Sequence, residues 1–96
     1  MIVHMPTWKT PKLKRLARIL AHIDDEIIMT QFLRDLCTLE ELRELSSRWE
    51  VVELLNKKIP YREIAEKTGV STATITRIAQ FLHHGEGGYQ KALKQE

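Results

Sequence analysis

The chain has 96 residues, of which 43% are apolar, and it holds two Trp, two Tyr, two Phe, four Gly and three Pro. Its 15 basic and 13 acidic residues give a net charge of +2, with basic residues at both ends of the sequence and acidic ones in the middle. This composition is typical of one small all-α domain, and no segment resembles a membrane span or a signal peptide, so we expect a cytoplasmic protein with no membrane partner.

The first predicted helix runs from Pro11 to about His22. Thr10 before Pro11 is typical of a helix cap followed by a first-turn proline, and the leucines of this segment recur at intervals of three and four. Five basic residues between Lys9 and Arg18 lie mostly off that apolar stripe, without any acidic residue among them. They indicate either a solvated face or a surface that contacts phosphate or a partner helix.

The second predicted helix is capped by Asp24 or Asp25 and ends at Cys37. Cys37 is the only cysteine, which excludes an internal disulfide and leaves it without a companion thiol for a zinc site. We expect it to be a small buried apolar residue, and we expect neither a metal nor a cofactor. The residues spaced to face a core are Ile27, Ile28, Phe32 and Leu36.

The longest predicted helix, at residues 38–58, has the clearest start signal in the chain. Thr38 and Glu41 form the capping-box pattern, in which each side chain bonds the other residue's backbone N–H. With Val51 and Leu54, its apolar stripe is too wide for one neighbouring helix, so we infer that a second copy of the chain covers part of it. The stripe consists of Leu39, Leu42, Leu45, Trp49, Val52 and Leu55.

Residues 60–84 predict a helix-turn-helix. Pro60 is placed in the first turn of the first helix, which buries Ile64 and Ala65. Gly69 supplies the left-handed residue that the turn needs. Ser71 then caps the second helix, whose buried stripe is Ile75, Ile78 and Leu82.

The outer face of this second helix, from Ser71 to Gln80, has no acidic residue. Short polar side chains with one guanidinium suit a helix that lies in the major groove of double-stranded DNA, with its N-terminal residues toward base edges and phosphates. The same pattern also fits a helical hairpin that binds no nucleic acid. The residues on this face are Thr72, Thr74, Thr76, Arg77 and Gln80.

The order of these parts resembles the Trp repressor family over roughly Leu36 to Leu93. The resemblance implies five to six helices in an intertwined homodimer, a transcriptional regulator expected to be a repressor, and a near-palindromic operator read by two helices in successive major grooves. The segments that carry it are Cys37-Thr38-Leu39-Glu40-Glu41, Leu45-Ser46-Ser47-Arg48, Arg62-Glu63-Ile64 and Ala73-Thr74-Ile75-Thr76-Arg77.

We place the domain at residues 9–96. Met5 is typical of an initiator methionine behind a short expression remnant, so residues 1–8 are left out. The glycine-rich run after the helix-turn-helix separates it from a last short helix. The predicted parts are dimerising helices at 9–36, a long core helix at 38–58, the helix-turn-helix at 60–84 and a short helix at 89–94.

The resemblance also implies DNA contacts. It makes Arg62 a direct reader of a base, and it places Thr72 and Ala73, beside the Ser71 cap, at the tip of the reading helix. The roles of two arginines stay open. Arg62 can instead form an ion pair with Glu66, one helical turn later, and Arg77 fits a residue that holds an effector, a phosphate contact or an ordinary surface cation. The residues assigned to phosphate or water are Thr74, Thr76 and Gln80.

An effector pocket is the last implication of the resemblance. In the family a bound tryptophan lies between the core and the reading helix, and Thr38, Arg48 and Arg77 match residues that hold it. Ile78 stands where the family has a glycine that leaves room for the indole, and Phe81 stands where it has a serine. Because we expect these two side chains to fill the space, we expect tryptophan not to bind, and the effector stays unknown.

The sequence disfavours an enzyme and leaves one alternative to DNA binding. An enzyme is not expected, because no acid, base and nucleophile occur in a pattern that forms a site, and adjacent positions such as His83 and His84 point in different directions on a helix. The alternative to a DNA-binding protein is a protein-interaction module built on the same helices.

Overall fold

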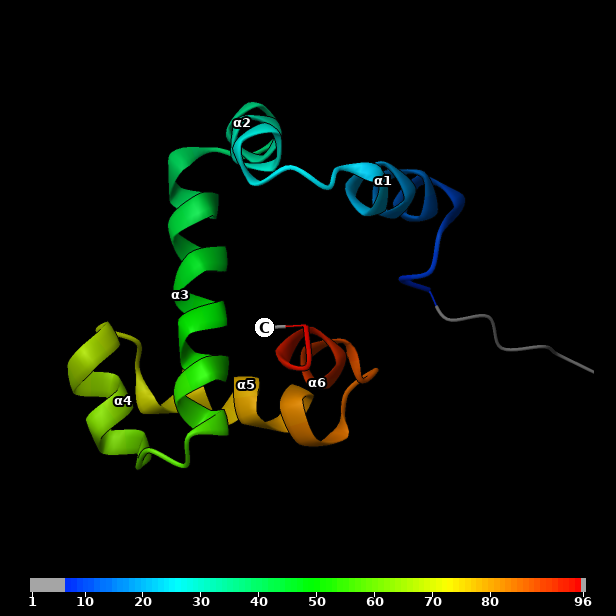
Figure 1. The fold of residues 1–96 in the computed structure, drawn as a ribbon. Helices are drawn as coiled ribbons and strands as arrows, with labels where there is room; N and C mark the ends of the chain where they lie inside the picture. Colours follow the sequence, from blue (N-terminus) through cyan, green and yellow to red (C-terminus); the bar gives the residue numbers. More distant parts are fainter. Residues whose placement is uncertain (1–6, 96) are drawn as a thin grey trace, which may run out of the picture. The chain divides into compact units, whose positions relative to one another are not determined.

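The computed structural model describes residues 7–95, which form six α-helices and no strand (Figure 1). The predicted all-α class is confirmed. Residues 1–6, which include Met5 and most of the supposed expression remnant, and Glu96 lie outside the described residues. The helices are α1 (Pro11–His22), α2 (Glu26–Leu36), α3 (Leu39–Asn56), α4 (Tyr61–Thr68), α5 (Thr72–His84) and α6 (Gly88–Leu93).

Contacts between residues divide the chain into two compact units, one that ends at Thr38 and one that begins at Leu39. The first unit contains α1 and α2, and the second contains α3 to α6. No helix within residues 7–95 combines the length and the apolar character that a membrane span requires.

The two helices of the first unit begin at the caps that the sequence predicts. The hydroxyl of Thr10 accepts a hydrogen bond of 3.0 Å from the backbone N–H of Leu13. Asp25, rather than Asp24, caps α2 by accepting from the N–H of Ile28 at 3.0 Å. Because a cap replaces water at an otherwise unpaired N–H, each of these side chains fixes where its helix starts.

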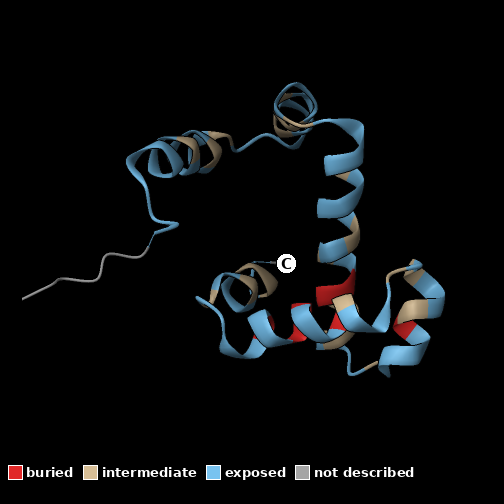
Figure 2. Cartoon of the chain, turned by 180° about the vertical axis from the view of Figure 1, so that it is seen from behind, coloured by how far each residue is buried: buried red, intermediate tan, exposed pale blue. Residues whose placement is uncertain are grey.

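The apolar stripes of α1 and α2 stay largely uncovered within the single chain. Neither helix has a buried residue (Figure 2), and Ile27 on α2 is 70% exposed. Cys37, expected to be buried, is only half-buried at the end of α2. Local signals are therefore enough to form both helices, although the described chain does not supply a core for them.

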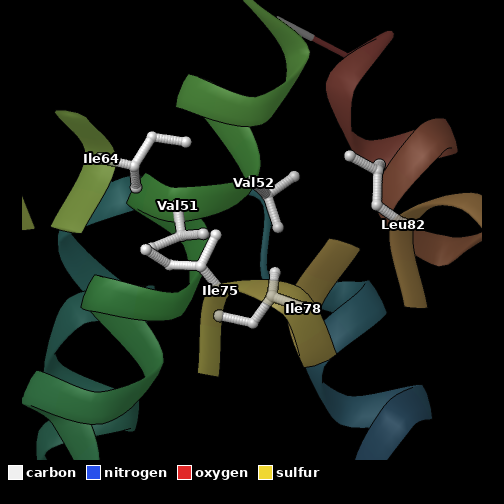
Figure 3. Packing of buried hydrophobic residues seen from close by; sticks show 6 residues of the cluster. All are labelled: Val51, Val52, Ile64, Ile75, Ile78 and Leu82. Carbon is white, nitrogen blue, oxygen red and sulfur yellow. The ribbon is translucent and has the colours of Figure 1, made fainter. Parts of the chain in front are cut away.

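The core of the second unit lies where α3, α4 and α5 meet. Six buried side chains from these helices point toward one another (Figure 3), and burying each one contributes about 1.5–3 kcal/mol. The C-terminal half of α3 supplies two of them, whereas Leu39 and Leu45 in its N-terminal half remain 53% and 46% exposed. The six are Val51, Val52, Ile64, Ile75, Ile78 and Leu82.

The end of α3 adopts a geometry that is unusual for its sequence. Lys58 has a positive φ of 62°, the left-handed conformation that glycine normally provides. Its N–H donates to the carbonyl of Leu55 at 2.9 Å, and the N–H of Ile59 donates to the carbonyl of Leu54 at 3.2 Å. These two bonds form a Schellman motif, and Leu54 and Ile59 both pack against the core.

Candidate nucleic-acid interface

The turn between α4 and α5 has the form predicted for a helix-turn-helix. Gly69 ends α4 in the left-handed region with φ 76°, and its N–H donates to the carbonyl of Ala65 at 2.9 Å. A Cβ placed on Gly69 would meet no atom within 4 Å. The glycine is therefore needed for its backbone conformation and not to make space between the two helices.

Thr68 ties the turn to α4 on both sides of Gly69. Its hydroxyl donates to the carbonyl of Ile64 at 2.7 Å and accepts from the N–H of Val70 at 3.1 Å. Val70, between the two helices, packs half-buried against the core. Pro60 differs from its predicted place, because it lies at the cap position just before α4 and not in the first turn.

The opposite sides of α5 have different environments. Ile75, Ile78 and Leu82 are buried against α3 and α4, so the orientation of the helix about its axis is fixed. The other side faces solvent, and residues 71–84 include no Asp or Glu. The predicted DNA-binding residues that are exposed on α5 and at its cap are Ser71, Thr72, Ala73, Thr76, Arg77 and Gln80.

Thr74 is the one predicted residue of this face that is not fully exposed. It is half-buried, its N–H donates to the Ser71 hydroxyl at 3.2 Å, and its own hydroxyl accepts from that group at 3.0 Å. Thr76 remains exposed, and its hydroxyl donates to the carbonyl of Thr72 at 2.9 Å. Both hydroxyls thus already have a partner inside the protein, although each keeps lone pairs that accept from water.

Arg62 projects from the first turn of α4 and is exposed. The alternative in which it pairs with Glu66 does not occur within residues 7–95, where the ion pair of α4 joins Lys67 and Glu63 at 3.7 Å. The guanidinium of Arg62 is therefore available for an outside partner, and its planar fork matches the two acceptors of a guanine edge.

A hollow of about 390 Å³ lies beside α5, and it brings together four of the five residues predicted for an effector pocket. Arg48 on α3 and Arg77 on α5 both line it. The fifth residue, Thr38, belongs to the other unit of the chain. The complete lining is Arg48, Thr74, Arg77, Ile78, Phe81 and Tyr89.

The expected filling of this pocket by Ile78 and Phe81 takes a different form in the structure. Ile78 is directed into the core and is only 4% exposed, so it forms part of the wall. Phe81 is 61% exposed and lies at the rim. The hollow therefore remains open in the described chain, and Ile78 does not fill it.

Two lining residues, Thr74 and Tyr89, were not predicted for this pocket, and Tyr89 on α6 had no predicted role at all. Its ring lies 6.3 Å from that of Trp49 between centroids, tilted by 48°, a typical geometry for an aromatic pair. The contact holds α6 against α3, and Gln90 adds a 2.8 Å hydrogen bond from its amide to the carbonyl of Leu82. In the sequence, the only signal for this contact is that an aromatic residue, Tyr89, follows soon after α5.

A second and larger hollow, of about 470 Å³, adjoins the turn of the helix-turn-helix. It shares Arg48, Thr74 and Ile78 with the first hollow.

Among the described residues, no three His, Cys, Asp or Glu side chains gather in an arrangement that could hold a metal ion. His83 and His84 lie side by side at the end of α5, with ring centroids 6.3 Å apart.

Comparisons with known proteins agree on one family. The family model described as Trp repressor protein matches residues 11–96. An uncharacterised protein of Bacillus subtilis, YerC, is 41% identical over 63 residues, covering 66% of this chain and 61% of YerC, so the match spans less than two thirds of that relative. A Trp operon repressor homolog of Chlamydia trachomatis serovar L2 is 37% identical over 71 residues, covering 69% of this chain and 76% of that protein.

A solved structure is similar in fold. The crystal structure of a TrpR-like protein from Eubacterium eligens superposes with a TM-score of 0.84 at 37% sequence identity, covering 91% of this chain and 90% of that one. The 91% of the chain that is aligned includes residues of both units.

Proposed function

Since the chain belongs to the Trp repressor family of DNA-binding transcriptional regulators, we propose that it is a sequence-specific regulator that reads double-stranded DNA with α5 and Arg62. The observation that supports this most directly is the exposed face from Ser71 to Gln80, which has no acidic residue and is held by buried side chains on its opposite side. Such a face can approach phosphates without charge repulsion.

Each part of this surface has a role that follows from its chemistry. Arg62 is proposed to donate two hydrogen bonds to a guanine in the major groove, where this contact discriminates between bases. Thr72 and Ala73 present small apolar and hydroxyl groups at the tip of α5, where they can lie close to base edges. Ser71, Thr74, Thr76, Arg77 and Gln80 are proposed to contact phosphates directly or through water.

We further propose that the regulator acts as an intertwined homodimer of residues 9–96, with the helices in 9–36 of each chain covering the other chain. The uncovered apolar residues of α1, α2 and the N-terminal half of α3 support this, because a chain of this size buries little apolar surface alone. Two reading helices related by a twofold axis favour a near-palindromic operator. Repression of transcription and a cytoplasmic location belong to the same proposal.

Sedimentation equilibrium of the purified chain tests the homodimer. A mass twice that of the 11.2 kDa chain at micromolar concentration is the expected result. A monomer at all accessible concentrations would contradict the dimer, and the near-palindromic operator would lose its physical basis.

The proposed regulator does not use tryptophan as its corepressor. This part of the proposal rests on the sequence resemblance, in which Ile78 stands where the family leaves space for the indole. In the structure Ile78 is directed into the core and forms part of the wall of the open hollow beside Arg48 and Arg77. Isothermal titration of the purified protein with L-tryptophan is expected to give no saturable heat. Saturable binding at micromolar concentration would overturn this part of the proposal and would assign the hollow to tryptophan.

Gel-shift titration in the presence of heparin tests DNA binding itself. The chain is expected to shift duplex DNA at low salt and to lose affinity steeply as the salt concentration rises, because each phosphate contact releases bound counterions. Absence of any shift at low salt would contradict the proposed function and would favour a protein-interaction module.

A further inference from the structure

Helix α1 carries a cationic face that the helix-turn-helix does not explain. Lys14, Arg15 and Arg18 are exposed and follow the spacing that places them next to one another on one side of the helix. Leu16 and Leu20 point to the other side and are half-buried. The basic and apolar residues lie mostly on different sides of the helix, although Ile19, one turn after Arg15, is also exposed.

The charges on this face are not balanced inside the protein. Residues 7–23 contain no Asp or Glu, and within residues 7–95 no carboxylate lies within 4.0 Å of Lys14, Arg15 or Arg18. Cations one turn apart repel each other, and α1 has no acidic residue in its first turn, as is also the case for α5 and α6. An anion bound to this face would reduce the repulsion.

The kind of anion follows from which side of α1 is available. A helix that lies in a membrane surface inserts its apolar face. Leu13 and Ile19 are exposed in the single chain, but in the proposed homodimer the apolar side of α1 packs on the other chain. The side that then remains exposed is the cationic one, which presents two guanidiniums and an ammonium. A regularly charged polyanion such as the DNA backbone matches these cations by charge alone.

We propose that the cationic face of α1, formed by Lys14, Arg15 and Arg18, contacts the phosphate backbone of double-stranded DNA. This inference rests on the proposed function. The contacts carry no sequence information, so α1 raises the affinity for operator and random DNA equally, whereas Arg62 and α5 supply the discrimination. The overall charge of +2 thus conceals a second, local DNA-binding surface.

The test uses the full chain and two matched double variants. Lys14→Gln with Arg18→Gln removes two exposed cations from α1, and Lys91→Gln with Lys94→Gln removes two exposed cations from the end of the chain. Glutamine has a helix propensity close to that of lysine and arginine, so α1 is expected to persist, and circular dichroism checks this. Lys14→Arg with Arg18→Lys preserves the charge and serves as a rescue.

Dissociation constants are measured by fluorescence anisotropy for a selected operator and a random duplex between low and physiological salt. For Lys14→Gln with Arg18→Gln we expect a loss on the order of tenfold on both duplexes at the same salt, and a decrease of the salt slope by about 0.9 per phosphate contact removed. The ratio of the two affinities should stay unchanged. The rescue variant and the Lys91/Lys94 variant should bind like the wild type.

Three results would overturn the inference. The first is wild-type affinity and salt slope in the Lys14/Arg18 variant, and the second is an equal loss in the Lys91/Lys94 variant, which would indicate a general charge effect. The third is cosedimentation of the chain with phosphatidylserine–phosphatidylcholine vesicles that depends on Lys14 and Arg18 while DNA binding does not. Failure of the wild type to bind either duplex would instead remove the proposed function, and this inference with it.

Discussion

The side chain of Ser71 and the residue Thr74 are joined by two hydrogen bonds at the start of α5. The Ser71 hydroxyl accepts from the N–H of Thr74 at 3.2 Å and donates to its hydroxyl at 3.0 Å. The first bond satisfies a free backbone donor, and the second holds Thr74 against the protein. The tip of the proposed reading helix is therefore fixed by its own side chains before any DNA binds.

Replacing Ser71 separates the structural role of the cap from its place on the DNA face. Ser71→Ala should lower the free energy of unfolding by about 1 kcal/mol, because the N–H of Thr74 loses its acceptor. Ser71→Asp should keep the stability, since aspartate caps equally well, but it should weaken DNA binding by placing a negative charge beside the phosphates. Urea denaturation at one protein concentration and anisotropy titration measure the two effects. Wild-type DNA affinity in Ser71→Asp would exclude this end of α5 from the interface.

Gly69 and Gly88 provide a matched pair for the turn. Gly69→Ala forces alanine into the left-handed region without any clash, so the free energy of unfolding should decrease by about 1–2 kcal/mol. Gly88→Ala, in the first turn of α6, adds the same methyl group in open space at a helical position and should be neutral or slightly stabilising. Urea denaturation of both variants gives the comparison. Equal effects at the two positions would show that conformation does not decide the cost at Gly69.

The left-handed backbone conformation of Lys58 allows a stabilising substitution. Lys58→Gly relieves a left-handed residue with φ 62° and should raise the free energy of unfolding by about 1 kcal/mol. Lys58→Ala removes the same charge but keeps the strained backbone, so it should leave stability nearly unchanged. Thermal and urea unfolding distinguish the two variants. A similar gain in both would attribute the effect to the lost charge and not to the backbone.

Caps and turns are the features that the sequence predicted best. Thr10, Ser71 and Gly69 act through bonds and dihedral angles within a few residues, so their positions can be inferred from the neighbouring sequence. Lys58 escaped prediction because nothing in a lysine signals a positive φ. Its conformation follows from the packing of Leu54 and Ile59, which carries the chain around the end of α3.

The candidate site was less predictable than the fold. The stripe of α5 was correct, since Ile75, Ile78 and Leu82 are buried as expected. Tyr89 was missed as a lining residue because its position depends on the contact with Trp49, forty residues earlier in the chain. The sequence also predicted that Ile78 and Phe81 fill the hollow, which remains open in the structure. The directions of these two side chains are set by packing, which the sequence does not show.

Arg62 and Lys67 differ in the effect expected on sequence preference. Arg62→Ala should weaken binding by about 1–3 kcal/mol and relax the preference at one base pair, because a bidentate contact to guanine is lost. Lys67→Ala removes a cation from the same helix that is paired with Glu63, and it should affect all sequences equally and weakly. Competition titrations with single-base operator variants measure both. A uniform loss in Arg62→Ala would make Arg62 a phosphate contact.

Selection of binding sites from a random duplex pool tests the account as a whole, because it requires both sequence reading by α5 and a fixed pairing of two chains. The predicted result is a symmetric motif whose two half-sites lie about 10 base pairs apart, centre to centre. Recovery of bound DNA without an enriched motif, or of a single unpaired half-site, would contradict it.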